Sequence, residues 1–229
     1  MLLRRPHPLV LSITLLFLGA TLLLANWQYQ KGKARMRSGE AYQHVLNDKP
    51  LPLNMELARA EVWRAYVVTG HWLQSGAILL DNQMHGELPG YLAIAPFQLA
   101  NGKVVLVKRG WIPRDLPATA IPQPATGLQT ITLRVVPFKF RYLALSNEQI
   151  AGQVWQNLDR VAYERMIGHS LDACAEQLDS DRVLTRDWMP PDDGAFKNFS
   201  YAGQWLLFAV VALILFVRSH WKQKDGTDR

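Results

Sequence analysis

The chain has 229 residues, of which 49% are hydrophobic and 19% are charged. This length suits one folded domain with additional segments, and the composition excludes a disordered or low-complexity chain. The formal net charge is +6, but residues 28–197 carry 19 Lys or Arg against 17 Asp or Glu, so most of the excess lies at the two ends and argues against a nucleic-acid-binding surface.

The first apolar run lies near the N-terminus. No charged residue stands between Arg5 and Lys31, and residues 8–25 are almost wholly apolar. A helix of about 20 apolar residues spans the hydrocarbon core of a bilayer, so we expect a transmembrane helix over residues 8–27. A cleaved signal peptide is the alternative, but the run reaches Trp27 without a small-x-small cleavage site.

From residue 31 to about residue 60 the chain is polar and contains prolines, which predicts a connector with a possible short helix over 55–59. Runs rich in branched and aromatic residues then predict strands, and Asn101-Gly102 predicts a type I′ hairpin between two of them. The predicted strands cover residues 63–72, 77–83, 91–99, 103–111 and 129–138.

The remaining part of the middle region predicts a loop, a helix and a possible strand. Pro and Ala dominate residues 113–127, which we expect to form an exposed loop. Apolar residues at helical spacing over 158–167 predict one amphipathic helix against the sheet. Residues 182–188 are a possible last strand, and 190–194 predict an irregular approach to the next helix.

A second uncharged run precedes Arg218 and predicts a transmembrane helix over residues 198–218, followed by a basic tail over 219–229. Tyr201 and Trp205 at its border indicate a membrane interface rather than a buried core helix. The predicted fold class is therefore a membrane α+β protein, in which two transmembrane helices flank a mostly antiparallel β domain, a small barrel or sandwich with one or two helices.

The charges give a mixed indication of orientation. Basic residues in the tail favour a cytoplasmic C-terminus, whereas four that follow the first helix favour the opposite. Because two helices place both termini on one side and long loops translocate regardless of charge, we expect cytoplasmic termini and an extracytoplasmic domain over 28–197.

The sequence offers few groups for catalysis. Cys174 is the only cysteine, which excludes an intramolecular disulfide and paired-thiolate metal or redox sites, and we expect it to be buried. The chain has no paired carboxylates, nucleophile elbow, phosphate loop or metal-spaced cluster, so we expect a protein that is not an enzyme. His71 and His85 lie within the motifs described next, but are expected to be turn or surface residues.

Five short segments rich in Trp, Gln, Gly and Arg carry the clearest functional signal. They are WQYQK at 27–31, GHW at 70–72, LLDNQ with Gly86 and PGY at 79–91, VLVKRGWIP at 105–113, and NFSYAGQW at 198–205.

Two of these segments flank the predicted helices, so their side chains should gather near one membrane surface. The side chains are Trp27, Gln28, Tyr201, Gln204 and Trp205. An ordinary aromatic belt is the alternative interpretation.

Arg109 and Trp111 end a predicted strand. Arg109 could bind a carboxylate, such as a haem propionate, beside the flat apolar face of Trp111. Alternatively, Arg109 pairs with an acidic residue such as Asp81, and Trp111 plugs the end of the barrel.

In this order and layout, the motifs closely resemble the Surfeit-locus-one family of cytochrome c oxidase assembly factors over about residues 10–217. The resemblance implies a protein of the inner membrane with a periplasmic domain, and a role in delivering haem A to oxidase subunit I alongside other assembly factors. It further implies that Trp27, Gln28, Arg109, Trp111, Tyr201, Gln204 and Trp205 contact this transient cargo.

The sequence departs from the family at two positions. Many members have a His where this chain has Asn198, and Asn is not a strong axial haem ligand. Lys31 replaces the more usual Arg, which exchanges a bidentate fork for a point charge. We therefore expect a non-catalytic haem chaperone that binds loosely; the alternative is a scaffold for an assembly intermediate that never touches haem.

Overall fold

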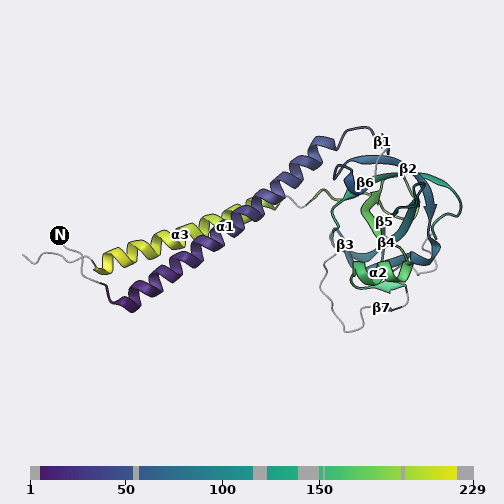
Figure 1. Cartoon of the computed structure of the whole chain (residues 1–229). Coiled ribbons are helices and arrows are strands. Elements are labelled where there is room, and N and C mark those ends of the chain that lie inside the picture. The colour runs from purple at the N-terminus through teal and green to yellow at the C-terminus, as the bar shows by residue number, and fades with distance from the viewer. Residues whose placement is uncertain are drawn as a thin grey trace, which may run out of the picture. The chain divides into compact units, whose positions relative to one another are not determined.

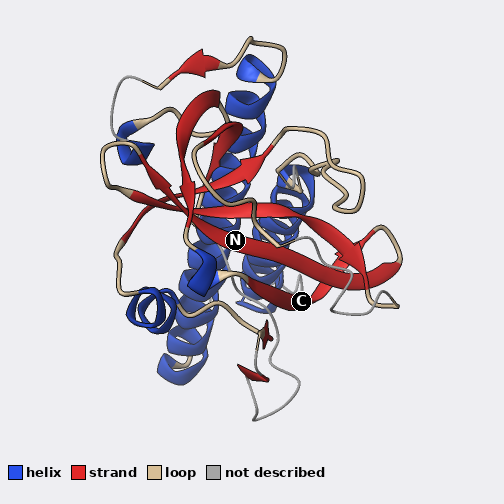
Figure 2. Ribbon diagram, turned by 90° about the vertical axis from the view of Figure 1, so that its right-hand side faces the viewer, coloured by secondary structure: helices blue, strands red, loops and turns tan. Residues whose placement is uncertain are grey.

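The computed structural model describes residues 6–53, 57–115, 123–138, 150–151, 153–191 and 194–220. It contains two compact units, one formed by Met1–Glu40 with Pro190–Arg229 and the other by Ala41–Met189. The first unit contains two long helices, α1 (Pro8–Val45) and α3 (Ala195–His220), which both views show side by side (Figures 1 and 2). Both helices are long and apolar enough to cross a membrane, as the sequence predicts.

Helix α1 is much longer than the predicted membrane span. It has 38 residues, which at about 1.5 Å per residue covers about 57 Å. The expected connector is therefore wrong between residues 31 and 45, because this stretch is rich in good helix formers and no proline interrupts it before Pro50. The last turn of α1 belongs to the second unit, where the ring of Tyr42 lies 5.7 Å from that of Trp63.

Small residues occupy several buried positions on each helix. In α1 the buried positions include Thr21, Ala25 and Gly32, and in α3 they include Ala202 and Ala209. Small side chains allow two helices to approach closely within a membrane, where hydrophobic burial does not drive their association. Most large apolar side chains of both helices instead face outward, as expected for lipid contact.

The second unit is a closed barrel of five strands with extra strands attached. The barrel strands are β2 (Ala65–Trp72), β4 (Leu88–Leu99), β5 (Val104–Pro113), β6 (Gln129–Val136) and β9 (Leu171–Gln177). They pair in the order β2-β6-β9-β5-β4 and close through β2–β4. Only the β5–β9 pair of the barrel is parallel. Figure 2 shows the strands curving around one another. The mostly antiparallel β domain predicted from the sequence is confirmed, and of the two predicted forms, small barrel or sandwich, the structure has the barrel.

Three two-residue strands, the eight-residue strand β3 and two turns of 3₁₀ helix also belong to this unit. The elements are β1 (Leu51–Pro52), η1 (Leu57–Arg59), η2 (Gln74–Gly76), β3 (Ile78–His85), β7 (Ile150–Ala151) and β8 (Val154–Trp155). The strand β3 pairs with β4 and extends the sheet beyond the barrel.

The predicted hairpin at Asn101-Gly102 is present, but its turn type differs. Gly102 has a φ of +81°, whereas Asn101 does not have the positive φ that a type I′ turn requires. The Gly102 N–H donates to the Leu99 carbonyl at 2.9 Å, and the Leu99 N–H donates to the Lys103 carbonyl at 2.8 Å. This is a three-residue loop, a type I turn followed by a left-handed glycine, and it is favoured because only one residue needs positive φ.

Apolar residues cover both faces of the β4–β5 region. Tyr66, Phe97 and Val105 belong to a cluster drawn from all five barrel strands, which is the barrel interior. The outer cluster includes Leu106 of β5 and Tyr163 of helix α2 (Arg160–Ile167), so the predicted amphipathic helix covers this outer face.

Two strand expectations near the C-terminal end of the domain need correction. Residues 182–188 form no strand and contribute one isolated bridge, between Thr185 and Trp111. The last barrel strand is β9, whose Asp, Ala and Glu residues have low strand propensity, so the sequence pattern hides it. Its buried Cys174 confirms the expectation for that residue.

Candidate functional site

Arg109 and Trp111 lie close in sequence but their side chains enter different environments. In the β4–β5 ladder, Gly110 pairs with Ala93 and Lys108 pairs with Ile94, which leaves Arg109 as the extra residue of a bulge. A bulge shifts the alternation of side chains between the two faces of a strand.

The Arg109 guanidinium lies 5.6 Å from the ring of Trp72, which belongs to the barrel interior. The Arg109 side chain is buried, and burial followed by repulsion from Arg186 lowers its pKa to about 10, against the opposing attraction of Asp181. Asp81, the partner considered for Arg109 from the sequence, accepts a hydrogen bond from Arg114.

The other motif residues of β3 and β4 have structural roles. Asn82 adopts a left-handed φ of +56°, a conformation that Asn tolerates, and the β3–β4 register shifts beside it. A Cβ on Gly90 would lie 2.2 Å from the Ile112 carbonyl oxygen and 2.5 Å from the Trp111 ring, so only glycine fits there. These motif residues shape the backbone around Trp111.

Trp111 lines a hollow of about 220 Å³ on the outer face of the barrel. Its indole N–H donates to the Gln83 carbonyl at 2.9 Å, and its ring lies 4.9 Å from the His85 ring. The hollow is lined by Gln83, Met84, His85, Leu92, Lys108, Trp111, Glu176, Thr185, Asp187, Trp188 and Met189. We call this feature the Trp111 hollow.

The charged groups of the Trp111 hollow are arranged in two pairs. Lys108 Nζ lies 3.2 Å from Glu176 Oε1 in its buried part, and burial raises the pKa of Glu176 despite the attraction of Lys108. His85 Nε2 lies 3.4 Å from Asp187 Oδ2, whose side chain is 70% exposed. His85 thus has a defined place beside Trp111, which sequence reasoning missed because nothing in the pattern pairs β3 with residue 187.

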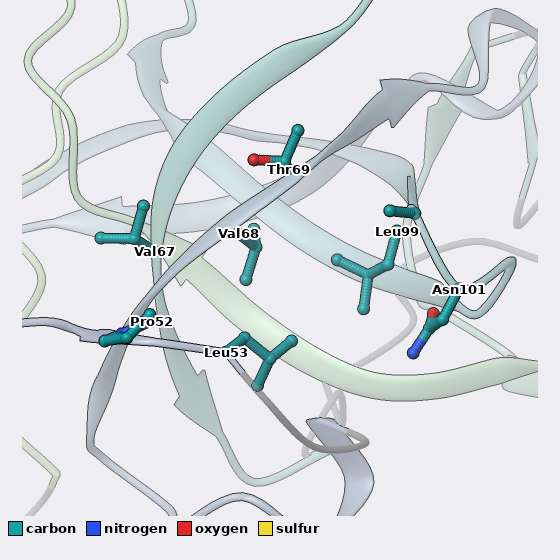
Figure 3. Close-up of a pocket in the computed structure, with 8 residues that line it drawn as sticks. Pro52, Leu53, Val67, Val68, Thr69, Leu99 and Asn101 are labelled. Atoms are coloured by element: carbon teal, nitrogen blue, oxygen red, sulfur yellow. The ribbon is translucent and has the colours of Figure 1, made fainter.

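A larger, open groove lies at another part of the barrel and is shown in Figure 3. It has a volume of about 680 Å³ and lies between β1, the middle of β2 and the β4–β5 hairpin. Its lining residues are Pro52, Leu53, Val67, Val68, Thr69, Leu99, Ala100 and Asn101. None of them is charged or aromatic, so this groove has no side chain that could bind a ligand by charge or by ring stacking.

The two helix-end motifs meet at one hydrogen bond between α1 and α3. Asn198 Nδ2 donates to Gln28 Oε1 at 2.7 Å, and Asn198 is only 6% exposed. Within the described part of the chain, no donor lies within hydrogen-bonding distance of Asn198 Oδ1. Next to this amide pair, the Tyr29 and Phe199 rings lie 5.7 Å apart. Sequence reasoning placed Gln28 near the start of the second helix but did not predict its hydrogen bond with Asn198.

The other helix-end residues point away from the contact between the two helices. Trp27 is 54% exposed and Tyr201 is 42% exposed, while Gln204 is also exposed and Trp205 is half-buried against Phe208. Lys31 Nζ lies 5.0 Å from the Trp27 ring. Of the five predicted side chains, the helix pair therefore buries Gln28 most directly and leaves three on its outer surface.

Metal-binding chemistry has no clear site in the described ranges. Within those residues, no group of three His, Cys, Asp or Glu side chains is placed to hold a metal ion. Cys174 is buried, and burial raises the pKa of its thiol to about 12, which keeps the thiol protonated.

Comparison with known proteins identifies the family. The chain is 26% identical over 212 residues to a SURF1-like protein of Mycobacterium tuberculosis, covering 84% of this chain and 74% of the relative. It is 24% identical over 214 residues to a SURF1-like protein of Rickettsia conorii, covering 89% of this chain and 88% of the relative. It is 26% identical over 146 residues to the cytochrome oxidase assembly protein SHY1 of Saccharomyces cerevisiae, covering 58% of this chain but 37% of the yeast protein. The SURF1 family model matches residues 15–210, and the chain belongs to this family.

Proposed function

We propose that this protein is an assembly factor for the haem-copper cytochrome c oxidase and assists the insertion of haem A into subunit I as a non-catalytic chaperone. The observation that carries the assembly role is family membership over residues 15–210, together with a yeast relative that is named a cytochrome oxidase assembly protein. Its partners in this proposal are subunit I, other assembly factors and the lipid bilayer.

The proposed location is the inner (cell) membrane, with both termini in the cytoplasm and the barrel in the periplasm. Two helices of suitable length and hydropathy support the membrane part of the proposal. The basic residues after α3 support the orientation, because Lys and Arg are retained on the cytoplasmic side.

The outward-facing aromatic residues support cargo contact at the helix pair. An apolar macrocycle would lie along the lipid-facing side of α1 and α3, against Trp27, Tyr201, Gln204 and Trp205, with Gln28 at its polar edge. Because Trp27 and Tyr201 are exposed, packing between the helices does not account for their presence. In the barrel, Trp111 and Arg109 are the candidates for contact with the cargo.

The arrangement favours loose binding. Asn198 is engaged with Gln28 and is not a strong axial ligand. The Trp111 hollow holds about 220 Å³, below the roughly 300–1,000 Å³ of sites that enclose drug-sized ligands, so it does not enclose a macrocycle. A carrier that must release its cargo gains from weak, open contacts.

The experiment is purification of the full chain from cells that make haem A, followed by measurement of Soret absorbance per mole of protein. Wild type should carry substoichiometric pigment. The double variant Trp27→Leu/Tyr201→Leu should carry several-fold less. The matched control is Phe17→Leu/Phe216→Leu, which removes two aromatic rings elsewhere on the same helices and should retain pigment.

The alternative function is a scaffold that stabilises an oxidase intermediate without binding haem. The buried Asn198–Gln28 pair favours it, because the position that is often His in the family serves here in helix packing. If wild type shows no Soret band under conditions where a known haem carrier does, yet co-purifies with subunit I, the scaffold function replaces the chaperone function.

A further inference from the structure

We propose that the Trp111 hollow is a docking socket for a single aromatic side chain of a partner polypeptide, flanked in that partner by Lys or Arg. This inference concerns protein recognition and does not depend on haem binding. It rests on the size, wall chemistry and rim charge of the hollow.

The size of the hollow suits one ring. A sealed apolar cavity of about 150 Å³ is sufficient to bind benzene, whereas sites for drug-sized ligands start near 300 Å³. At about 220 Å³ the Trp111 hollow lies between these values. Its occupant is therefore one side chain rather than a whole cofactor or nucleotide.

The polar atoms of the aromatic walls already have partners. The Trp111 indole N–H donates to the Gln83 carbonyl at 2.9 Å, and the Trp188 indole N–H donates to the Gln177 carbonyl at 2.7 Å. Both indoles therefore present apolar ring surface to an occupant.

Two methionines form an exposed, adaptable rim. Met84 is 53% exposed and Met189 is 67% exposed, although both line the same hollow. Thioethers are flexible and make favourable contacts with aromatic rings. A pocket with a buried aromatic floor and methionines at its rim is the kind into which a partner inserts an anchor side chain.

The charge at the rim favours particular residues on either side of the inserted aromatic ring in the partner. The side chain of Asp187, a lining residue of the hollow, is 70% exposed. Inside the hollow, Lys108 and Glu176 compensate one another. Asp187 therefore leaves an exposed carboxylate at the rim, which favours a ring flanked by basic residues.

The test uses the full chain in lipid nanodiscs and short peptides as probes. The reporter is acetyl-Lys-Phe-Lys-amide carrying para-fluorophenylalanine, observed by fluorine NMR and displaced by unlabelled peptides. Acetyl-Lys-Phe-Lys-amide should compete at least about ten-fold better than acetyl-Lys-Ala-Lys-amide, because the ring supplies the apolar contact. It should compete about two- to five-fold better than acetyl-Glu-Phe-Glu-amide, as expected for exposed ion pairs.

Variants at the exposed rim separate docking from folding. Asp187→Lys should reverse the preference between the Lys-flanked and Glu-flanked peptides, whereas Asp115→Lys, an exposed acidic residue outside the hollow lining, should leave it unchanged. Met84→Ala with Met189→Ala should weaken both aromatic peptides, and an unchanged melting temperature will show that the barrel stays folded.

Three results would overturn the proposal. The first is equal competition by the Phe and Ala peptides. The second is a charge preference that Asp187→Lys does not alter. The third is a dimer of the wild-type chain in nanodiscs that Asp187→Lys dissociates, which would assign the hollow to a second copy of this chain.

Discussion

The family motifs occur in both units, but the helix pair and the barrel use them differently. In the barrel, the motif residues are needed for folding: Leu80 is fully buried, and Gly90 leaves no room for a Cβ beside Trp111. In the helix pair, Gln28 has a packing role, while Trp27 and Tyr201 are exposed on the outer surface. Structural need therefore accounts for Leu80 and Gly90, and the exposed helix-end aromatics are the better guide to function.

Gly90→Ala should be the most damaging change. Its Cβ would meet the Ile112 carbonyl oxygen at 2.2 Å, and backbone cannot yield as a flexible side chain can. We expect destabilisation of the barrel by more than about 3 kcal/mol, measured by thermal unfolding in detergent. Gly39→Ala in α1 is the control, since nothing lies within 4 Å of its Cβ. If Gly90→Ala and Gly39→Ala melt at similar temperatures, Gly90 is not packed tightly against Ile112 and Trp111.

Glu176→Leu should rank second, because it leaves the Lys108 ammonium largely buried without its carboxylate. The expected cost is about 3 kcal/mol, and Lys108→Met in the same chain should recover most of it. A double variant as unstable as Glu176→Leu alone would contradict this account of the pair.

The same glutamate predicts a pH dependence. Because burial raises the pKa of Glu176 in the folded state, the folded protein binds the proton more readily than the unfolded chain. The Glu176 contribution to stability therefore falls as pH rises from the ordinary value through the raised pKa. The free energy of unfolding, measured across this pH range, should fall more steeply for wild type than for Glu176→Leu. Identical pH profiles for the two proteins would refute this prediction.

The amide pair between α1 and α3 should contribute less. Hydrogen bonds between membrane helices average about 0.6 kcal/mol and reach about 1.7 kcal/mol. A double-mutant cycle with Gln28→Leu and Asn198→Leu should give a coupling energy in this range. Zero coupling would mean that small-residue packing alone holds the helices together.

Alkylation of Cys174 should give the smallest effect, and its measurement needs no substitution. The burial of Cys174 raises the thiol pKa to about 12, so alkylation at neutral pH should occur only through unfolding. Rapid labelling of the native protein, followed by mass spectrometry, would show that the barrel opens around β9.

Sequence reasoning predicted much of this architecture because the relevant signals are local. Charge-free runs predicted α1 and α3, and short runs rich in branched residues predicted β2 to β6. The missed strand β9 has a polar sequence and is held by its neighbours β5 and β6, a tertiary effect that local propensity does not contain. The extension of α1 was missed because polarity was taken to indicate a connector.

The candidate site was predictable in its residues but not in its geometry. Arg109 and Trp111 were expected to act together, yet the bulge at Arg109 places one over Trp72 and the other beside His85. Neither a bulge nor the pairing of His85 with Asp187 can be recognised from the spacing of apolar residues in the sequence. The Asn198–Gln28 bond likewise depends on the register of two helices 170 residues apart in the chain.

We infer that the exposed helix-end side chains serve oxidase assembly rather than folding. This inference is tested most directly by the haem a signal of the oxidase in cells that carry Trp27→Leu/Tyr201→Leu/Gln204→Leu, normalised to the amount of this protein in the membrane. We predict normal protein levels with a several-fold lower haem a signal, while Phe17→Leu/Phe216→Leu behaves as wild type. A normal haem a signal in the triple variant would contradict the account.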